Sequence, residues 1–156
     1  MACQQGEIEP RRRWMAVLAR APSADIERYL KAAPTLPPHV RLRGPEAGLI
    51  MVRGRAGGAG APFNLGEMTV TRCSVRTEGS GGTPLIGHAY VTGRDTAQAE
   101  LAARLDAGLQ DPALRDALLE TVIAPLAADQ AARKEAIASR AAATQVQFFT
   151  MATMRS

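Results

Sequence analysis

The chain has 156 residues, of which 46% are hydrophobic and 22% are charged, and this composition excludes a globally disordered protein. The length fits a single domain over residues 1–156, and because only 4% of residues are aromatic, the core is expected to consist mainly of leucine, valine, isoleucine and alanine. A surplus of 19 lysine and arginine residues over 15 aspartate and glutamate residues permits an anionic ligand without identifying one.

The N-terminal third is predicted to form two helices after a flexible start over residues 1–10. The first helix has an apolar stripe at i, i+3, i+4 and i+7, formed by Trp14, Val17, Leu18 and Ala21. The arginine run over residues 11–13 is interpreted as a solvated helix start rather than a phosphate patch. Ser23 is placed to cap the second helix, which prolines at positions 34, 37 and 38 end.

The middle third is predicted to form an antiparallel β-meander, because its connections are too short for helical crossovers. Residues 39–44 and 48–55 alternate as strands do, with a turn at Gly44–Pro45 between them. A further strand runs from about residue 67 to residue 77, and residues 85–93 return as its partner. The sequence therefore predicts a small sheet at the centre of the fold.

A glycine-rich loop over residues 54–62 precedes the third of these strands. Glycines let backbone N–H groups approach a phosphate, but the dinucleotide-binding pattern requires the glycines to open a helix. Here they lead through Pro62 into a strand, so a mobile hairpin loop is favoured over a phosphate cradle.

The C-terminal half is predicted to be helical again. Asp95 or Thr96 caps one helix, and Asp111–Pro112 starts the next with aspartate at the N-cap and proline at the first helical position. Pro125 is expected to kink or break that helix, after which an alanine-rich helix follows. The apolar tail over residues 144–156 is expected to form a late strand or to dock on a partner. The predicted fold class is α+β, with N-terminal helices, a central antiparallel meander and C-terminal helices.

Two arginines and a cysteine alternate along the central strand. Arg72 and Arg76 share one face, where they could bind an oxyanion or pair with carboxylates of a neighbouring element, and both interpretations remain open. Cys73 lies on the other face, and a buried, inert thiol is favoured over a nucleophile because no histidine lies beside it in the sequence.

Two further polar residues lie on the return strand and at its end. His88 could act as a general base or contact a ligand, although a histidine bonded to a neighbouring backbone group is the commoner arrangement. Asp95 is explained by its capping role, which leaves Arg94 as a candidate anion contact at a strand-to-helix junction.

The cysteines and histidines do not have the spacing of metal ligands. Cys3, Cys73, His39 and His88 form neither a C-x-x-C nor an H-x-x-x-H pair, so no metal site is expected. The first ten residues lack the pattern of a signal peptide, and no apolar run approaches the roughly 20 residues needed to cross a bilayer. A cytoplasmic protein with reduced thiols is expected.

Three stretches carry a resemblance to a known family. They are "GGAGAPFNLGEMTVTRCSVR", "GHAYVTGRDTAQAELAARLDAGLQ" and "VQFFTM", which follow the helical opening "RRRWMAVLARA". In this order they resemble the G subunit of the bacterial carbon–phosphorus lyase system, the PhnG family. The similarity runs from about Arg11 to Met151 and covers most of the chain.

The resemblance implies a component of an enzyme that is not catalytic alone. In that family the G subunit acts with its H, I and L partners on MgATP and an alkylphosphonate, which displaces adenine from the anomeric ribose carbon. A radical iron–sulfur subunit, the J protein, later breaks the C–P bond. The resemblance thus implies that this chain binds no cofactor itself and that MgATP is the substrate of the complex. Because its C-terminal tail is apolar, the isolated chain is expected to self-associate into homo-oligomers when its partners are missing.

The family assigns no catalytic residue to this subunit, so the sites are hypotheses from the residues. Asn64, Glu67 and Arg72 are expected to organise an inter-subunit edge, with the preceding loop becoming ordered on assembly. The alternative is a nucleotide- or phosphonate-binding accessory protein that contacts its ligand through Arg72, Arg76, His88 and Arg94. A nucleic-acid-binding regulator is weakly supported, because the arginines are scattered and exposed aromatic pairs are lacking.

Overall fold

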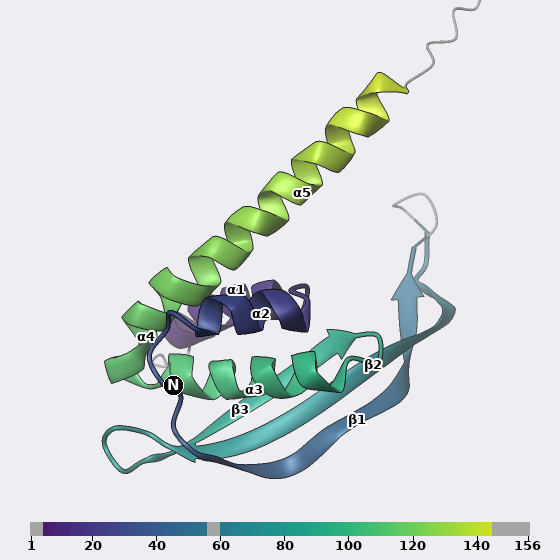
Figure 1. Cartoon of the computed structure of the whole chain (residues 1–156). Coiled ribbons are helices and arrows are strands. Elements are labelled where there is room, and N and C mark those ends of the chain that lie inside the picture. The colour runs from purple at the N-terminus through teal and green to yellow at the C-terminus, as the bar shows by residue number, and fades with distance from the viewer. Residues whose placement is uncertain (1–4, 56–59, 145–156) are drawn as a thin grey trace, which may run out of the picture.

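The computed structural model describes the backbone of residues 5–55 and 60–144 and the side chains from residue 9 onward. Helices cover one face of a three-stranded antiparallel sheet with the strand order β1-β2-β3 (Figure 1). The elements are α1 (Gln5–Leu18), α2 (Ser23–Leu30), β1 (His39–Gly54), β2 (Phe63–Glu78), β3 (Pro84–Thr92), α3 (Thr96–Gln110), α4 (Pro112–Leu118), the π-helical turn η1 (Leu119–Ile123) and α5 (Ala124–Ala143). The predicted α+β class is confirmed, whereas the predicted final strand lies outside the described residues.

Helix α3 lies directly on the sheet and forms the centre of the core. Cys73 and Val75 of β2 and Ala89 and Val91 of β3 are buried on the face toward this helix. Gly87 also faces α3, and a Cβ atom built there would lie 1.9 Å from the Ala103 carbonyl oxygen. The alternation predicted for β2 is therefore confirmed, and it decides which side chains face the helices and which face away.

Helices α1 and α2 pack on the side of α3 that is turned away from the sheet (Figure 1). Trp14 and Leu18 of α1, Ile26 of α2, and Leu118 and Val122 are all buried in the same cluster as the α3 leucines. The apolar stripe predicted for the first helix is therefore confirmed. The core is built mainly from small and aliphatic side chains, as the composition indicates.

The N-cap predicted for α2 is wrong. Ser23 is the first helical residue, and its hydroxyl donates to the Asp95 carboxylate at 2.7 Å instead of capping its own helix. Asp95 in turn caps α3 by accepting the Gln98 N–H at 2.9 Å, which confirms that cap. These hydrogen bonds hold the pKa of Asp95 below its ordinary value. The contact links the start of α2 to the start of α3.

The turn predicted at Gly44–Pro45 is also wrong, because β1 continues through it as one strand of 16 residues. Its pairing with β2 shifts register between Arg41 and Arg43 and again between Arg43 and Glu46. Proline lacks an N–H for the ladder and is tolerated in strands at such irregularities. The proline and glycine signals therefore mark a bulge within a strand.

The break predicted at Pro125 takes the form of a π-helical turn. Pro112 begins α4 behind the Asp111 cap, as predicted, and η1 then leads directly into α5. Pro125 has no N–H that could donate a hydrogen bond to a carbonyl of the preceding helical turn. The wider π turn before it accommodates the missing hydrogen bond. The helix continues through the proline rather than ending there.

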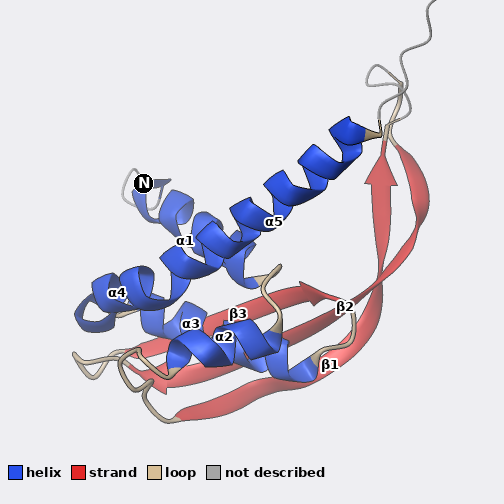
Figure 2. Cartoon of the chain, turned by 45° about the horizontal axis from the view of Figure 1, so that its top comes forward, coloured by secondary structure: helices blue, strands red, loops and turns tan. Residues whose placement is uncertain are grey.

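Two segments project from the body on the same side (Figures 1 and 2). One is the outer part of the β1–β2 hairpin, residues 49–54 and 63–68, called the arm below. The other is the second half of α5, in which every residue from 131 to 144 is exposed. Burial along β2 begins only at Val70, and the arm extends past the helical layer.

Candidate functional site

The open face of the sheet, opposite α3, gathers three of the predicted site residues. Arg72 and Arg76 project from β2, and His88 projects from β3. The register places Arg72 opposite Tyr90, and it places Ser74 opposite His88. Because directly opposed residues of antiparallel strands share a face, these side chains form one polar surface.

A carboxylate from β1 forms ion pairs with two arginines, Arg43 and Arg72. Arg72 donates from Nε to Glu46 at 2.6 Å, and Arg43 donates to the same carboxylate oxygen. The two guanidinium groups, Arg72 first, lower the pKa of Glu46, while Glu46 and the Tyr90 hydroxyl raise the pKa of Arg72. Of the two interpretations left open for Arg72, pairing with a neighbouring carboxylate is therefore the one present in the structure.

His88 forms a hydrogen bond with a hydroxyl on the same surface. Its Nδ1 lies 2.9 Å from Ser74 Oγ, and its own backbone N–H donates to Asp106 at 2.9 Å. A serine paired with a histidine can support nucleophilic chemistry only when a third group orients the ring. Within the described residues no carboxylate is hydrogen-bonded to the His88 ring, so this pair lacks that third group.

A hollow beside His88 is too small for a nucleotide. It has a volume of about 220 Å³ and is lined by Met15 and Ala16 of α1, residues 88–91 of β3 and Ala102 of α3 among others. Pockets for drug-sized ligands are typically about 300–1,000 Å³ and contain several convergent polar groups. Most of this lining is apolar, and it does not fit a triphosphate.

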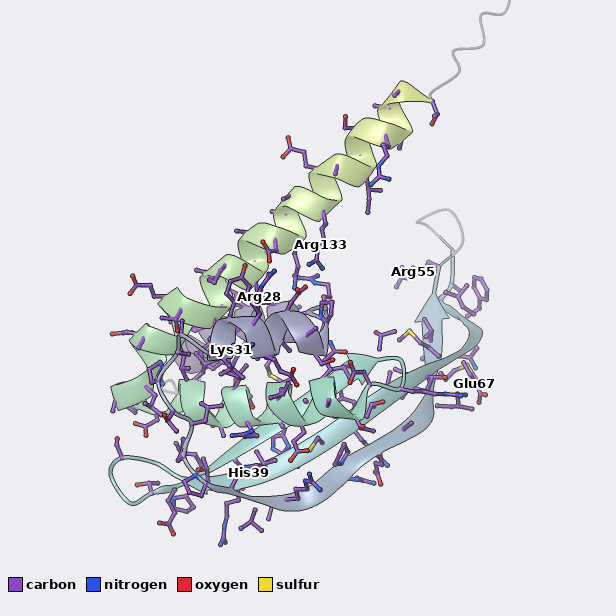
Figure 3. The ribbon with its side chains drawn as sticks, in the orientation of Figure 1. Arg28, Lys31, His39, Arg55, Glu67 and Arg133 are labelled. Carbon is purple, nitrogen blue, oxygen red and sulfur yellow. The ribbon has the colours of Figure 1, made fainter. Side chains whose placement is uncertain are left out.

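Three other predicted site residues lie away from this surface. Asn64 and Glu67 are exposed on the arm, where they lie opposite Arg53 and Met51. Figure 3 places Glu67 on the projecting arm, far from His39 at the other end of the sheet. Arg94 is exposed at the junction of β3 and α3. Arg72 therefore lies apart from Asn64 and Glu67, on the open face and paired with Glu46, and the inter-subunit role of the three residues stays a prediction.

The sequence analysis did not identify Asp106, the side chain that accepts the most hydrogen bonds within the described residues. Asp106 of α3 is fully buried and accepts from Arg11 at 2.7 and 3.1 Å, from the Trp14 indole at 2.9 Å and from the His88 backbone. The solvated helix start predicted for residues 11–13 is wrong for Arg11, which reaches inward to this carboxylate. The only sequence signal was an aspartate between two apolar residues of a buried helix.

Cys73 fits the interpretation of a buried, inert thiol. It is 1% exposed, its thiol donates to the Arg43 carbonyl at 3.5 Å, and burial raises its pKa above the ordinary value. A thiol with a raised pKa holds less of the reactive thiolate at neutral pH.

We expect Cys73 to resist modification in the folded protein. In a Cys3→Ser variant, which leaves Cys73 as the single thiol, a disulfide-exchange reagent at pH 7.5 should react more than about 100-fold more slowly than after unfolding in guanidinium, because the thiol is both buried and protonated. Absorbance of the released thiolate measures both rates. Equal rates in the two states would contradict the burial of Cys73.

Neither a metal centre nor a spanning helix is apparent in residues 5–55 and 60–144. Among these residues, no three histidine, cysteine, aspartate or glutamate side chains come together in a group that could hold a metal ion. No helix in the same part of the chain is both long and apolar enough to cross a membrane.

Comparisons with known proteins identify the family of this chain. A family model described as "Phosphonate metabolism protein PhnG" matches residues 9–154. A protein of Rhizobium meliloti (strain 1021), named alpha-D-ribose 1-methylphosphonate 5-triphosphate synthase subunit PhnG, is 44% identical over an alignment of 147 residues, which covers 92% of this chain and 89% of that protein. A match of this length includes both the sheet and the helices that cover it, and on that ground the chain belongs to the PhnG family of phosphonate metabolism proteins.

Proposed function

We propose that this chain is a non-autonomous subunit of α-D-ribose 1-methylphosphonate 5-triphosphate synthase. The observation that carries the proposal is the 44% identity, over 92% of the chain, to a relative that bears the name of this synthase subunit. The proposed partners are the H, I and L subunits, with the J subunit acting on the product. MgATP is the substrate of the complex, and the chain needs no cofactor of its own.

In the proposed reaction, an oxygen of the alkylphosphonate attacks the anomeric carbon of the ribose of MgATP. The bond from that carbon to N9 of adenine breaks, its electron pair stays with the base, and adenine leaves after taking up a proton. Such a displacement requires a proton donor near the base and cationic groups around the triphosphate. The product is α-D-ribose 1-methylphosphonate 5-triphosphate when the phosphonate is methylphosphonate.

The arrangement of polar groups supports a subunit role over a complete enzyme. Arg72 and Arg43 are both bonded to Glu46, so each guanidinium already has a carboxylate partner within this chain. His88 is bonded to Ser74 on an open surface rather than in a cleft that excludes water. An active site formed with other subunits accounts for a chain whose described residues hold no complete catalytic set.

We expect adenine release to depend on this chain. The cognate H, I and L subunits should convert MgATP and methylphosphonate to adenine and the phosphonate-linked ribose product when the chain is present. Omission of the chain should reduce the rate to the background without enzyme. Chromatography of adenine and phosphorus NMR of the product measure the two outcomes.

A parallel reaction with the J subunit added serves as the control, because J acts after adenine has left and should leave the release of adenine unchanged. Equal product formation with and without this chain would refute the proposed role. Saturable ATP binding by the isolated chain, lost in Arg72→Ala, would then support the alternative of an accessory protein that binds the nucleotide.

A further inference from the structure

The arm exposes an unusual number of large apolar side chains. Leu49 is 63% exposed, Leu65 is 59% exposed and Met51 is 50% exposed. Phe63 and Ile50 are also exposed, at 46% and 40%. Single apolar residues on a surface need no explanation, but a contiguous group of this size marks an interaction site in a soluble protein.

These side chains occupy both faces of the arm. Ile50 lies opposite Met68 in the register, so these two share one face. Leu49 and Met51 are the flanking residues on β1 and therefore point to the other face, because side chains alternate along a strand. Neither face of the arm is covered by a described helix, whereas the inner face of the sheet between Thr71 and Thr77 is buried beneath α3.

A ribbon of two strands is unstable in water when it has no packing partner. Two-stranded hairpins are marginal at best without a third strand or a helix against them. The arm is held at its base by the sheet, and a register shift beside Gly66, whose φ is +153°, increases the twist within its outer part. Its apolar side chains thus extend from the body in a defined direction and remain in contact with solvent.

We propose that the arm inserts into an apolar groove on another subunit of the synthase, which encloses both of its faces. This inference rests on the proposed function, because the subunit that would bind the arm belongs to the proposed synthase complex. A second copy packed arm against arm would cover one face and leave the other in water, so it explains only half of the exposed side chains. Methionine, phenylalanine and arginine are enriched in interface cores, and the arm contains Met51, Met68, Phe63 and Arg53.

The polar residues of the arm fit the rim of such an interface. Glu67 and Arg55 lie on the projecting part of the hairpin in Figure 3, and Asn64 is exposed nearby. Interfaces typically surround an apolar centre with polar groups that stay accessible to water. Asn64 and Glu67 therefore keep an inter-subunit role, but as rim residues and without Arg72.

Paired threonine substitutions test the insertion, because threonine shortens the side chain and keeps a preference for strands. We expect Leu49→Thr with Met51→Thr on one face, and Ile50→Thr with Met68→Thr on the other, each to weaken association with the purified H, I and L subunits by about 100-fold. Association is measured by titrating the fluorescently labelled full-length chain. The melting temperature of each isolated variant should stay close to that of the wild-type chain.

The matched control lies on the same strand. Val40 and Leu42 are 60% and 52% exposed at the opposite end of β1, and they repeat the spacing of Leu49 and Met51. Val40→Thr with Leu42→Thr should leave association within about twofold of the wild type, because surface changes away from an interface have small effects. An equal loss in the arm and control variants would overturn the inference.

Photocrosslinking identifies the occupant directly. With p-benzoylphenylalanine in place of Phe63 and the complex assembled from purified subunits, crosslinked peptides should belong to a partner subunit. Crosslinks to a second copy, or to residues 145–156 of the same chain, would overturn the choice of occupant.

If the wild-type chain binds its partners and supports adenine release while the arm variants bind equally well, the insertion is refuted and the proposed function stands. If the wild-type chain neither binds nor is required, the proposed function itself fails.

Discussion

Replacement of Gly87 by alanine is expected to destabilise the protein severely. A Cβ atom at this position would lie 1.9 Å from the Ala103 carbonyl oxygen and 2.7 Å from the Ala107 backbone nitrogen. Both contacts are with the backbone of α3, so no side-chain rotation relieves them, and the helix must move away from the sheet. Overpacking of a core typically costs about 1–3 kcal/mol, and we expect a loss at or above the upper end of that range.

The measurement is thermal unfolding of the purified chain followed by circular dichroism. For a chain of this length, about 3 kcal/mol corresponds to a fall in Tm of roughly 6–12 °C. Gly48→Ala is the matched control, because Gly48 is also in a strand and a Cβ atom there meets nothing within 4 Å. We expect the control to change stability by less than about 1 kcal/mol. A Gly87→Ala variant as stable as the control would show that α3 does not pack on β3 as closely as described.

The close approach of α3 to Gly87 illustrates what local sequence patterns can and cannot predict. The alternation along β2 and the apolar stripe of the first helix follow from a few neighbouring residues, and both predictions are confirmed. The need for glycine at position 87 depends on a helix that begins nine residues later and folds back over the strand. The sequence gives no local sign of that contact.

The predictions that failed involve residues whose signals have two structural meanings. Gly44–Pro45 is typical of a turn, yet the same residues also occur at bulges in long strands, and the register of β1 with β2 decides between them. Ser23 is a good N-cap residue, but Asp95 lies within hydrogen-bond distance and takes its hydroxyl. In both cases a residue distant in the sequence selects the structure.

Only part of the candidate site could be predicted from the sequence, again because some of the interacting residues are distant from one another along the chain. Period-two alternation placed Arg72 and Arg76 together on one face, and the register added His88. The partner of Arg72 is Glu46, 26 residues earlier on another strand, and no local pattern indicates it. The predicted inter-subunit edge groups Glu67 with Arg72 because the two are close in the sequence. Five residues of extended chain nevertheless place these two positions about 16 Å apart.

The buried carboxylate of Asp106 is the clearest case of a group that only the tertiary structure reveals. Its main partner, Arg11, lies 95 positions away in the sequence, and its remaining donors come from Trp14, the His88 backbone and Gln110. The carboxylate joins α1, α3 and β3 at one point. A buried charge is tolerated only when it is paired and fully hydrogen-bonded, and here several donors surround it.

We expect Asp106→Ala to destabilise the protein by about 3 kcal/mol, mainly because the Trp14 indole N–H and the His88 backbone N–H lose their acceptor. The Arg11 side chain is 34% exposed and can turn toward water, so its charge adds less than that of a fully buried partner. Urea unfolding measures the loss, with Asp116→Ala at an exposed position of α4 as the control, expected within about 0.5 kcal/mol of the wild type. If Asp106→Ala fails to fold, Trp14→Phe still tests the network, since it removes one donor and should cost about 1 kcal/mol. An Asp106→Ala variant as stable as the Asp116→Ala control would mean that these hydrogen bonds do not hold α1 and β3 against α3.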